Sequence, residues 1–311
     1  MTHIVTFTNL FPNSVQPTHG TFVRERMRRV VAAGGFAWTV VAPVPAVIAP
    51  LRWGIFREQS RIPVAEVYDG VDCRHPRYRH WPGFSLRRQA AAMARGARDT
   101  MRELAARGPI VVDAHYLWPD GVAAAMLADE LGVPFAWTAR GTDVNVIAGD
   151  AYVAAELRRW APRATFVAAV SRALADRTAE VTGLPREAVH EVRNGVDLAR
   201  FRPGDAQAAR RALGLPTEGK LLLGVGRLVP GKGFAVAARA VASLPADVRL
   251  VLVGDGPERA EIAAALGERV IFLGKRGPEQ VAEAFRAADL FVMPSEREGW
   301  PNVVTEALAS G

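Results

Sequence analysis

Residues 220–234 read KLLLGVGRLVPGKGF, and this stretch decides which fold the sequence predicts. It opens with a short, mostly apolar run that ends at glycine, which is typical of a strand buried in a parallel sheet. A glycine-rich turn follows, and a helix is expected to begin at about Phe234. Strands that lead through a turn into a helix are the repeating unit of α/β proteins, so we expect a parallel sheet covered by helices.

The same alternation of strand and helix runs along the rest of the chain. Strand-like runs form two series, HIVTFTN, AWTVVAP, IVVDAHY, FAWTAR and TFVAAVS, then AVHEVRN, KLLLGVGRL, VRLVLVGDG, RVIFLGK and DLFVMPS. Because 311 residues exceed what one hydrophobic core usually holds, we expect two doubly wound α/β domains, residues 1–170 and residues 171–311, that face a cleft. Ligands of such sheets bind beyond the carboxyl ends of the strands.

The first half of the chain carries the excess of positive charge. Up to Val170 there are 20 Lys and Arg against 14 Asp and Glu, and after Val170 there are 19 against 18. Seven arginines and no acid stand between Asp72 and Asp99. This stretch predicts peripheral contact with an anionic membrane surface or an acidic polymer, and a solvated basic face is the alternative. No motif resembles a nucleic-acid-binding motif, so we expect no nucleic acid partner.

The N-terminal residues MTHIVTFTNLFPN predict a first strand and a loop rather than a signal peptide, because they lack a basic flank and a long apolar run. No stretch of the sequence is apolar for long enough to span a bilayer. We therefore expect a cytoplasmic protein that can contact the inner face of the plasma membrane.

The turn in residues 220–234 offers two cations to a phosphate group. Arg227 and Lys232 stand five residues apart, and the backbone amides of the following helix add donors. The glycine fingerprint of dinucleotide-binding folds is incomplete here and in GDGPER, residues 254–259. The turn therefore predicts a diphosphate site, and a common glycine turn with solvated charges is the alternative.

Residues 295–308, SEREGWPNVVTEAL, predict a second group of ligand-binding residues. Asn302 is a good N-cap, so we expect a helix to start there with unpaired amides at residues 303–305. These amides suit phosphate oxygens, whereas the carboxylates of Glu298 and Glu306 accept hydrogen bonds from sugar hydroxyls. The alternative is that Glu306 only favours the helix dipole and that Glu298 is only an exposed loop acid.

Taken together, these motifs resemble the retaining glycosyltransferases of family 4, which have the GT-B fold. Glu298 and Glu306, with seven residues between them, match the E-x7-E motif of that family. The start of the chain and the REGWPN segment resemble the branch that builds teichuronic acid, capsule or exopolysaccharide. Further motifs agree in order and spacing: HGTFVRER, DAHYLWPDG, TARGTDV, VRNGVDLARF, GRLVPGKG, LVGDGPER and VIFLG.

The resemblance implies roles for residues of the second domain. The two cations of the turn bind the donor diphosphate and stabilise the charge that develops on the leaving nucleotide. Glu306 takes the ribose hydroxyls, and Glu298 holds hydroxyls of the transferred sugar during catalysis. Asn302 and Val303 donate hydrogen bonds from the start of their helix.

The resemblance implies roles in the first domain as well. His115 contacts the donor sugar near the reacting carbon, although a histidine at a strand end is often structural. Gly20 lies where a loop approaches the phosphates and leaves no room for a side chain. Asp143 lines the acceptor side or caps its turn. Arg140 replaces a histidine found in many relatives and adds a cation that points to an anionic ligand.

The family's mechanism is implied too. The acceptor attacks the face from which the leaving group departs, and the donor phosphate takes the acceptor's proton, so no protein nucleophile is required. No Asp-x-Asp pair lies in the expected cleft, so we expect a metal-independent enzyme without a cofactor. The resemblance implies a donor that is a UDP- or GDP-linked sugar and an acceptor that is a cell-surface polysaccharide or a lipid-linked glycan, with an anionic glycan among the possibilities.

Other classes of function stay open at this point. A sugar-nucleotide epimerase or a phosphorylase shares the GT-B fold, and a non-catalytic chain would only bind a nucleotide or a membrane surface. The family pattern continues for some tens of residues past Gly311, so the resemblance implies a C-terminally truncated sequence with an incomplete second domain.

Overall fold

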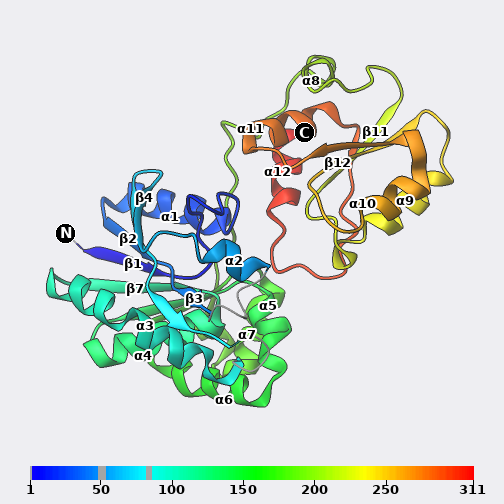
Figure 1. Ribbon diagram of the computed structural model, residues 1–311. Coiled ribbons are helices and arrows are strands. Elements are labelled where there is room, and N and C mark those ends of the chain that lie inside the picture. The colour runs from blue at the N-terminus through cyan, green and yellow to red at the C-terminus, as the bar shows by residue number, and fades with distance from the viewer. Residues whose placement is uncertain (1, 48–53, 82–85) are drawn as a thin grey trace. The chain divides into compact units, whose positions relative to one another are not determined.

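The computed structural model describes residues 2–47, 54–81 and 86–311. The chain divides into two compact units, Met1–Asn194 and Gly195–Gly311 (Figure 1). Each unit is an α/β structure built on a parallel sheet, as the sequence predicts. Residue Phe84 and its neighbours in the arginine-rich stretch, residues 82–85, lie outside the described residues.

The first unit contains an eight-stranded sheet in the order β10-β9-β8-β7-β1-β2-β5-β4. All neighbouring strands are parallel except β4 and β5, which are antiparallel. A separate parallel pair joins β3 to β6. The strands are β1 (His3–Phe7), β2 (Ala37–Val41), β3 (Val44–Ala46), β4 (Ala65–Tyr68), β5 (Val71–Arg74), β6 (Arg77–Arg79), β7 (Ile110–His115), β8 (Phe135–Ala139), β9 (Phe166–Ala169) and β10 (Val189–Glu191).

Helices follow the strands of the first unit. The longest of them, α3, repeats apolar residues three and four positions apart and buries six of them, Ala90, Met93, Ala94, Ala97, Met101 and Leu104. It packs against α4 and β6. The helices are α1 (Thr21–Gly34), α2 (Ile55–Gln59), α3 (Leu86–Ala106), α4 (Val122–Leu131), α5 (Thr142–Asn145), α6 (Ala151–Trp160) and α7 (Arg172–Thr182), with short helical turns at Leu117–Gly121, Ile147–Gly149, Ala161–Arg163 and Arg186–Ala188.

The boundary between the units differs from the expected one at residue 170. The run AVHEVRN, which we assigned to the second series of strands, forms β10 and pairs with β9 in the first sheet. In this pairing Val189 lies opposite Val167, and both side chains are buried. The expected boundary was therefore too early, because the last strand of the first sheet comes after α7.

The second unit contains a four-stranded parallel sheet in the order β13-β12-β11-β14. Its helix α9 begins at Phe234, as predicted. The strands are β11 (Lys220–Val225), β12 (Val248–Val253), β13 (Val270–Gly274) and β14 (Leu290–Phe291); the helices are α8 (Ala206–Ala212), α9 (Phe234–Ala242), α10 (Arg259–Leu266), α11 (Pro278–Ala287) and α12 (Asn302–Ser310), with short helical turns at Pro230–Lys232 and Gly267–Arg269.

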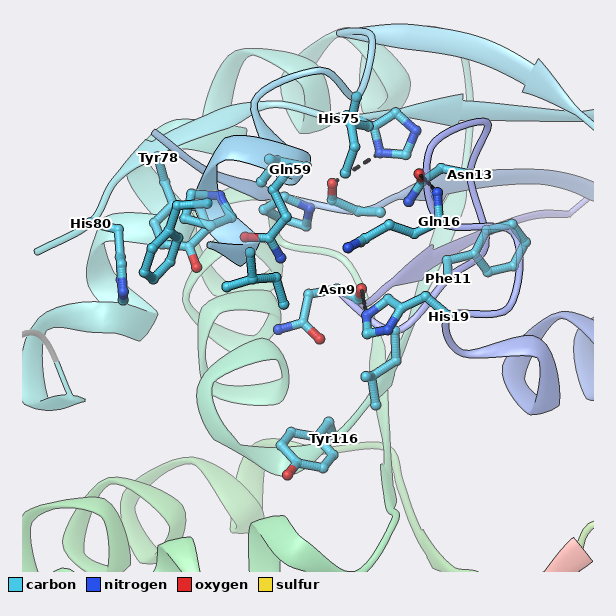
Figure 2. A pocket seen from close by; sticks show the side chains of 18 of the residues that line it. Asn9, Phe11, Asn13, Gln16, His19, Gln59, His75, Tyr78, His80 and Tyr116 are labelled. Carbon is cyan, nitrogen blue, oxygen red and sulfur yellow. Dashed lines mark hydrogen bonds between the residues drawn. The ribbon is translucent and has the colours of Figure 1, made fainter. Parts of the chain in front are cut away.

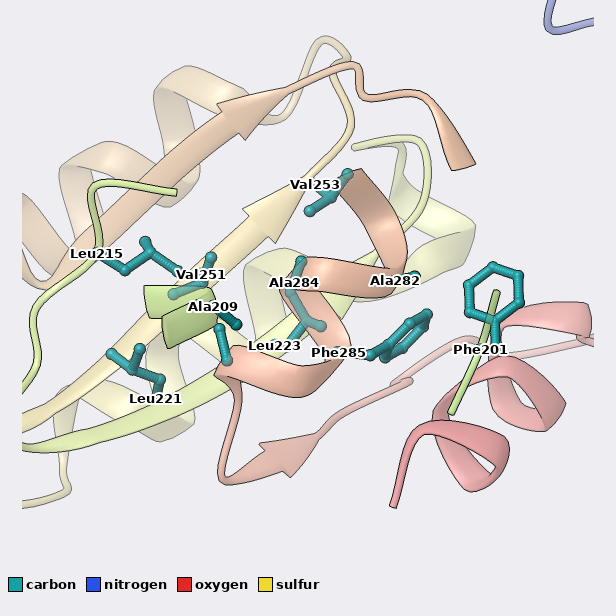
Figure 3. Close-up of a cluster of buried hydrophobic side chains, with 11 residues drawn as sticks. Phe201, Ala209, Leu215, Leu221, Leu223, Val251, Val253, Ala282, Ala284 and Phe285 are labelled. Carbon is teal, nitrogen blue, oxygen red and sulfur yellow. The ribbon is translucent and has the colours of Figure 1, made fainter. Parts of the chain in front are cut away.

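Alternating residues of β12 serve two hydrophobic cores, one on each face of the second sheet. Val251 and Val253 join the cluster that contains Phe285 of α11 (Figure 3). Leu250 and Leu252 join the opposite cluster, which contains Phe234 of α9. Side chains alternate between the faces of a strand, so a strand covered on both faces is apolar throughout. Burying each large apolar side chain stabilises the fold by roughly 1.5–3 kcal/mol.

The glycine turns after β11 and β12 pack directly against each other. A Cβ atom on Gly254 would lie 1.8 Å from the carbonyl oxygen of Gly226, and one on Gly256 would lie 2.3 Å from that of Leu228. Hydrogen bonds join the same two turns, among them Leu228 N to the oxygen of Asp255 at 3.1 Å. The GVG and GDG patterns therefore let two loops approach closely, which accounts for them without a dinucleotide.

Candidate functional site

The carboxyl ends of β1, β7 and β8 meet at one edge of the first sheet. The hydroxyl of Thr8, directly after β1, donates to the carbonyl oxygen of His115 at the end of β7 (3.2 Å). Tyr116 then adopts a φ of 82°, and its amide donates to the oxygen of Thr138 in β8 (3.0 Å). A non-glycine residue with positive φ is uncommon and often marks a functional site, so this edge is the first candidate region.

His115 is fully buried in a cluster of charged groups. Nη2 of Arg140 lies 2.7 Å from its Nδ1, and Oδ2 of Asp113 lies 3.0 Å from its Nε2, without the geometry of a hydrogen bond on that side. A guanidinium can only donate, so Nδ1 accepts and the proton of the neutral ring is on Nε2. Burial lowers the pKa of His115 to about 4. The charges of Arg140 and Arg26 also lower this pKa, whereas Asp113 raises it. The ring is therefore uncharged at neutral pH.

Arg140 connects this cluster to the end of the first unit. Its Nη1 donates to Oδ1 of Asn194 (2.9 Å), and its guanidinium lies 5.2 Å from the centre of the Phe22 ring. Burial and the neighbouring Arg26 lower the pKa of Arg140 to about 9, against the opposing effect of Asp113. Its Nε is buried without a hydrogen-bond partner among the described residues. A buried cation that lies near a second cation and has an unpaired donor is more typical of a functional site than of a structural one.

Asp143 holds the turn after β8. It is fully buried, and its carboxylate accepts hydrogen bonds from the amides of Leu117 (2.8 Å), Arg140 (3.2 Å) and Gly141 (2.7 Å). Burial raises its pKa in spite of these hydrogen bonds. These hydrogen bonds show that Asp143 holds its turn together, and its place on the acceptor side stays a prediction.

Asp120 is a second buried carboxyl group near the end of β1. It accepts a hydrogen bond from the amide of Asn9, while its Oδ2 has no partner among the described residues. Burial raises its pKa to about 8. Asp120 is therefore largely protonated at neutral pH and holds the loop after β1 without adding a full charge.

Gly20 lies at the start of α1, with a left-handed φ of 65°. A Cβ atom at this position would lie 2.1 Å from the carbonyl oxygen of Leu10. No side chain fits here, so the loop after β1 approaches the start of α1 as closely as backbone atoms allow.

A pocket of about 360 Å³ opens beside this loop (Figure 2). The loop contributes Asn9, Asn13 and Gln16 to its wall, and the segment around α2 contributes Gln59 from the other side. Tyr116, with its positive φ, also lines the pocket. This volume is within the range of small-molecule sites.

Three arginines of the basic stretch have acidic partners within the first unit. Arg74 lies 2.9 Å from Asp72, and Arg98 lies 3.0 Å from Glu130 of α4. Arg87 lies 3.6 Å from Asp150. These ion pairs reduce the charge that the stretch offers to an anionic surface, and membrane contact stays a prediction.

In the second unit, the turn after β11 meets the loop after β14. Arg227 is exposed on this turn, and Lys232 lies in the short helical turn that leads to α9. The amide of Glu296 donates to the oxygen of Gly231 (3.2 Å), which joins the two segments. Lys232 Nζ forms an ion pair and hydrogen bond with Oε1 of Glu298. The structure therefore brings together a predicted phosphate ligand and a predicted sugar ligand.

The start of α12 differs in detail from the prediction. Pro301 is the N-cap and Asn302 is the first helical residue, so Asn302 does not cap the helix. The amide of Val304 donates to the oxygen of Pro301 (3.0 Å) and is not open to a ligand. The amide of Val303 lies in the first turn, where donors usually lack helical partners. The side chain of Glu306 is largely buried in this helix, and burial raises its pKa to about 7.

Sequence reasoning missed several residues of the first unit. Asp113, Tyr116 and Asp120 all lie within the quoted motif DAHYLWPDG, but their spacing gave no sign of burial. Arg26 donates to the carbonyl oxygen of Val192 (3.2 Å) from α1 and adds to the positive charge near His115. These residues lie near the site only because the sheet brings together segments that are far apart in the sequence.

Comparison with known proteins identifies the class. Residues 20–200 match Glycosyltransferase Family 4, and residues 205–311 match Glycosyl transferases group 1. Sucrose-phosphate synthase from Thermosynechococcus elongatus shares the fold with a TM-score of 0.72 at 19% identity, over 100% of this chain and 79% of that one. HepE from Anabaena, in complex with UDP and glucose, gives 0.65 at 20% identity, over 99% and 78%. Two Rossmann-like units of this kind define the GT-B fold.

Sequence relatives specify the family. A protein named as a teichuronic acid biosynthesis glycosyltransferase, TuaC of Bacillus subtilis (strain 168), is 32% identical over 98% of this chain and 78% of its own length. The D-inositol 3-phosphate glycosyltransferase of Acidothermus cellulolyticus is 34% identical over 65% of this chain and 50% of its own length. The chain therefore spans about half the length of that second relative. The chain belongs to glycosyltransferase family 4.

Proposed function

We propose that this chain is a retaining, metal-independent glycosyltransferase that moves a sugar from a nucleotide-sugar donor to a glycan acceptor. The observation that carries the proposal is the meeting of Lys232 and Glu298 at the ends of parallel strands in the second unit. Family membership supports transfer over the epimerase and the non-catalytic alternatives. Structures of HepE contain UDP, UDP-glucose or UDP with glucose, which favours a nucleotide-sugar donor here.

The second unit would bind the donor by exchanging partners. Without ligand, the charges of Lys232 and Glu298 neutralise each other. A diphosphate attracts Lys232 more strongly than a single carboxylate does, and Arg227 adds a second cation from the same turn. Glu298 would then be available to accept hydrogen bonds from the sugar hydroxyls. The remaining donor contacts proposed are the Val303 amide, Asn302 and, for the ribose, Glu306.

The first unit would supply an uncharged hydrogen-bonding surface to the reacting sugar. A contact of His115 with the donor sugar would carry no net charge, because the imidazole is neutral, and it requires that the ring, which is fully buried in this structure, become exposed. Arg140 would add positive potential beside it and stabilise the leaving phosphate. Gly20, whose Cβ position is taken up by the carbonyl oxygen of Leu10, would hold the loop after β1 against the start of α1, where backbone amides can meet a phosphate.

The acceptor we propose is a glycan that belongs to a cell-surface polysaccharide or is attached to a lipid. Support comes from the name of the Bacillus relative, which refers to teichuronic acid biosynthesis. None of the helices in the described ranges combines the length and apolar composition needed to cross a bilayer. Contact with a lipid-linked acceptor would use the basic stretch of the first unit, at about 1 kcal/mol for each arginine near the lipid.

Calorimetric titration with UDP, GDP and their common sugars tests the donor site directly. Binding of one nucleotide, unchanged by EDTA, is expected. Transfer to a glycan acceptor, followed by NMR of the anomeric proton, should show the same anomeric configuration in donor and product. Loss of turnover in EDTA or an inverted product would contradict the mechanism, and a folded chain that binds no nucleotide would contradict the donor site.

A further inference from the structure

The pocket beside the loop after β1 has an unusual composition for a unit with an excess of positive charge. None of the described residues that line it is Asp, Glu, Lys or Arg. Its polar groups are the carboxamides of Asn9, Asn13, Gln16, Gln59 and Gln89, together with three imidazoles and two phenols. The pocket is therefore a hydrogen-bonding site without formal charge.

Burial favours the uncharged forms of the titratable side chains in the lining. Burial lowers the pKa of His19, His75 and His80 below the usual value for histidine. Burial also raises the pKa of Tyr78 and Tyr116 to about 12. The described residues of the lining offer no Asp, Glu, Lys or Arg as a counter-ion, so a charged ligand group would lose its hydration here without compensation.

Two charged residues next to the pocket, Glu66 and Arg77, are engaged in contacts with the protein. Oε1 of Glu66 lies 3.1 Å from Nε2 of His75, and Glu66 also accepts from the amide of Ser14. Arg77 donates to the carbonyl oxygens of Gln59 and Ile62. These contacts hold the wall of the pocket in place, and they leave recognition to the uncharged groups in front.

Gln59 shows that the pocket is built for a hydrogen-bond donor. Its Oε1 is buried and has no partner among the residues that the structure describes. A buried carbonyl oxygen without a partner costs free energy, so such an atom in a pocket points to a ligand that donates to it. In Figure 2 the side-chain amides of Gln16 and Gln59 come from opposite walls and extend into the same space, with that of Asn9 below them.

The apolar part of the lining suits a ring. Phe56 and His80 lie with ring centres 5.4 Å apart, and Tyr78 meets His80 edge to face at 6.1 Å. Sugar rings present C–H groups as well as hydroxyls, so they match a wall that combines aromatic faces with carboxamides.

We infer that this pocket binds an uncharged, hydroxyl-rich sugar unit of the acceptor glycan. Only one part of this inference rests on the proposed function, namely that the bound sugar belongs to the acceptor. It narrows the expectation of an anionic acceptor, which came from Arg140: any negative charge on the acceptor lies outside the pocket.

A matched pair of sugars tests the inference on the full chain. Methyl α-D-glucopyranoside and methyl α-D-glucuronide differ only in a carboxylate, and their Kd values can be measured by NMR titration. The neutral sugar is expected to bind at least tenfold more tightly. Gln59→Leu should weaken it about tenfold, whereas Gln59→Lys should shift the preference toward the glucuronide. Gln207→Leu, at an exposed position of α8, is the control that should change neither Kd.

Four outcomes would overturn the inference: no binding of either sugar, equal or tighter binding of the glucuronide, no effect of Gln59→Leu in a chain shown to be folded by circular dichroism, or no shift in preference with Gln59→Lys. Nucleotide titration of the same samples separates this from the proposed function. Neutral-sugar binding without nucleotide binding would leave the pocket supported and sink the donor site. Nucleotide binding with no neutral-sugar binding would do the reverse.

Discussion

The side chains of Arg140 in the first unit and Arg210 in the second are both at least partly buried, but their surroundings differ. Arg210 is 4% exposed, and its guanidinium donates to three backbone carbonyl oxygens and to Oδ2 of Asp289, at 2.6–3.2 Å. Arg140 contacts a neutral imidazole and an amide oxygen, and its Nε is left without a partner among the described residues. The surroundings of Arg210 supply acceptors for its guanidinium, whereas those of Arg140, as far as the structure describes them, leave one N–H donor of its guanidinium without an acceptor.

This difference separates a structural arginine from a candidate functional one. A satisfied guanidinium stabilises the fold, and removing it leaves several buried oxygens without donors. An unsatisfied one costs stability and is retained for what it does to a ligand. The same contrast extends to the two candidate sites: buried, interlocked groups in the first unit, and the partly exposed Lys232 and Glu298 in the second.

The largest effect is expected for Arg210→Met. The change removes donors from the oxygens of Thr217, Gly219 and Ala287 and leaves Asp289 with fewer partners, so the free energy of unfolding should fall by about 3–5 kcal/mol. Urea denaturation followed by circular dichroism measures the loss. Arg239→Met is the control, because its ion pair with Glu261 is exposed and should be worth less than about 1 kcal/mol. Equal losses in the two variants would break the comparison.

The next effect concerns the pH dependence of stability through His115. Its pKa is about 4 in the folded state against an ordinary value near 6.5, so the unfolded chain takes up the proton first as the pH falls. The wild type should lose up to about 3 kcal/mol of stability between pH 6.5 and pH 4 that His115→Gln does not lose. The difference between the two unfolding curves isolates this contribution from Asp120, which titrates with the opposite sign. A difference that stays constant with pH would contradict the neutral, buried imidazole.

Arg140→Met should reverse the pattern of Arg210→Met. We expect turnover with the donor and acceptor to fall by roughly 100-fold, because positive potential is lost near the leaving group. The free energy of unfolding should change by no more than about 1 kcal/mol, since an apolar side chain in place of an unsatisfied cation is often neutral. Parallel measurements of initial rate and urea denaturation decide this. A large loss of stability with full activity would make Arg140 structural.

The smallest effect is expected for the cations of the second unit. Arg227→Ala and Lys232→Ala should each weaken nucleotide binding about tenfold, roughly 1.4 kcal/mol, because both side chains are partly or fully exposed and screened by water. Unfolding curves of the two variants should match the wild type. Calorimetric titration gives the affinities, and unaltered Kd values would remove both residues from the proposed donor site.

Much of the fold could be predicted from the sequence because buried parallel strands are apolar over their whole length. The exceptions lie where that signal is weak. Residues 44–79 contain short strands, β3 to β6, with several exposed positions, and no strand was expected there. The boundary was placed too early because the run that forms β10 was expected as a strand of the second sheet, whereas it pairs with β9 across α7, and a local pattern does not reveal which sheet a strand joins.

The candidate site was predictable only as a set of residue types. The pairing of Lys232 with Glu298 joins segments 66 residues apart, and the contact of Arg140 with His115 joins segments 25 residues apart. Spacing along the chain indicated that such groups would lie near strand ends. It did not indicate burial, and burial decides which of them carry charge at neutral pH. The roles assigned to these residues stay predictions.

The close packing of the glycine turns after β11 and β12 changes how such patterns are read. In this protein the glycines that resemble a ligand-binding fingerprint allow contact within the chain, because each of the two turns packs against the other. A search that scores glycines alone would report a contact between two loops as a cofactor. A glycine pattern in a sequence can thus indicate close packing of two segments of the same chain as well as the binding of a ligand.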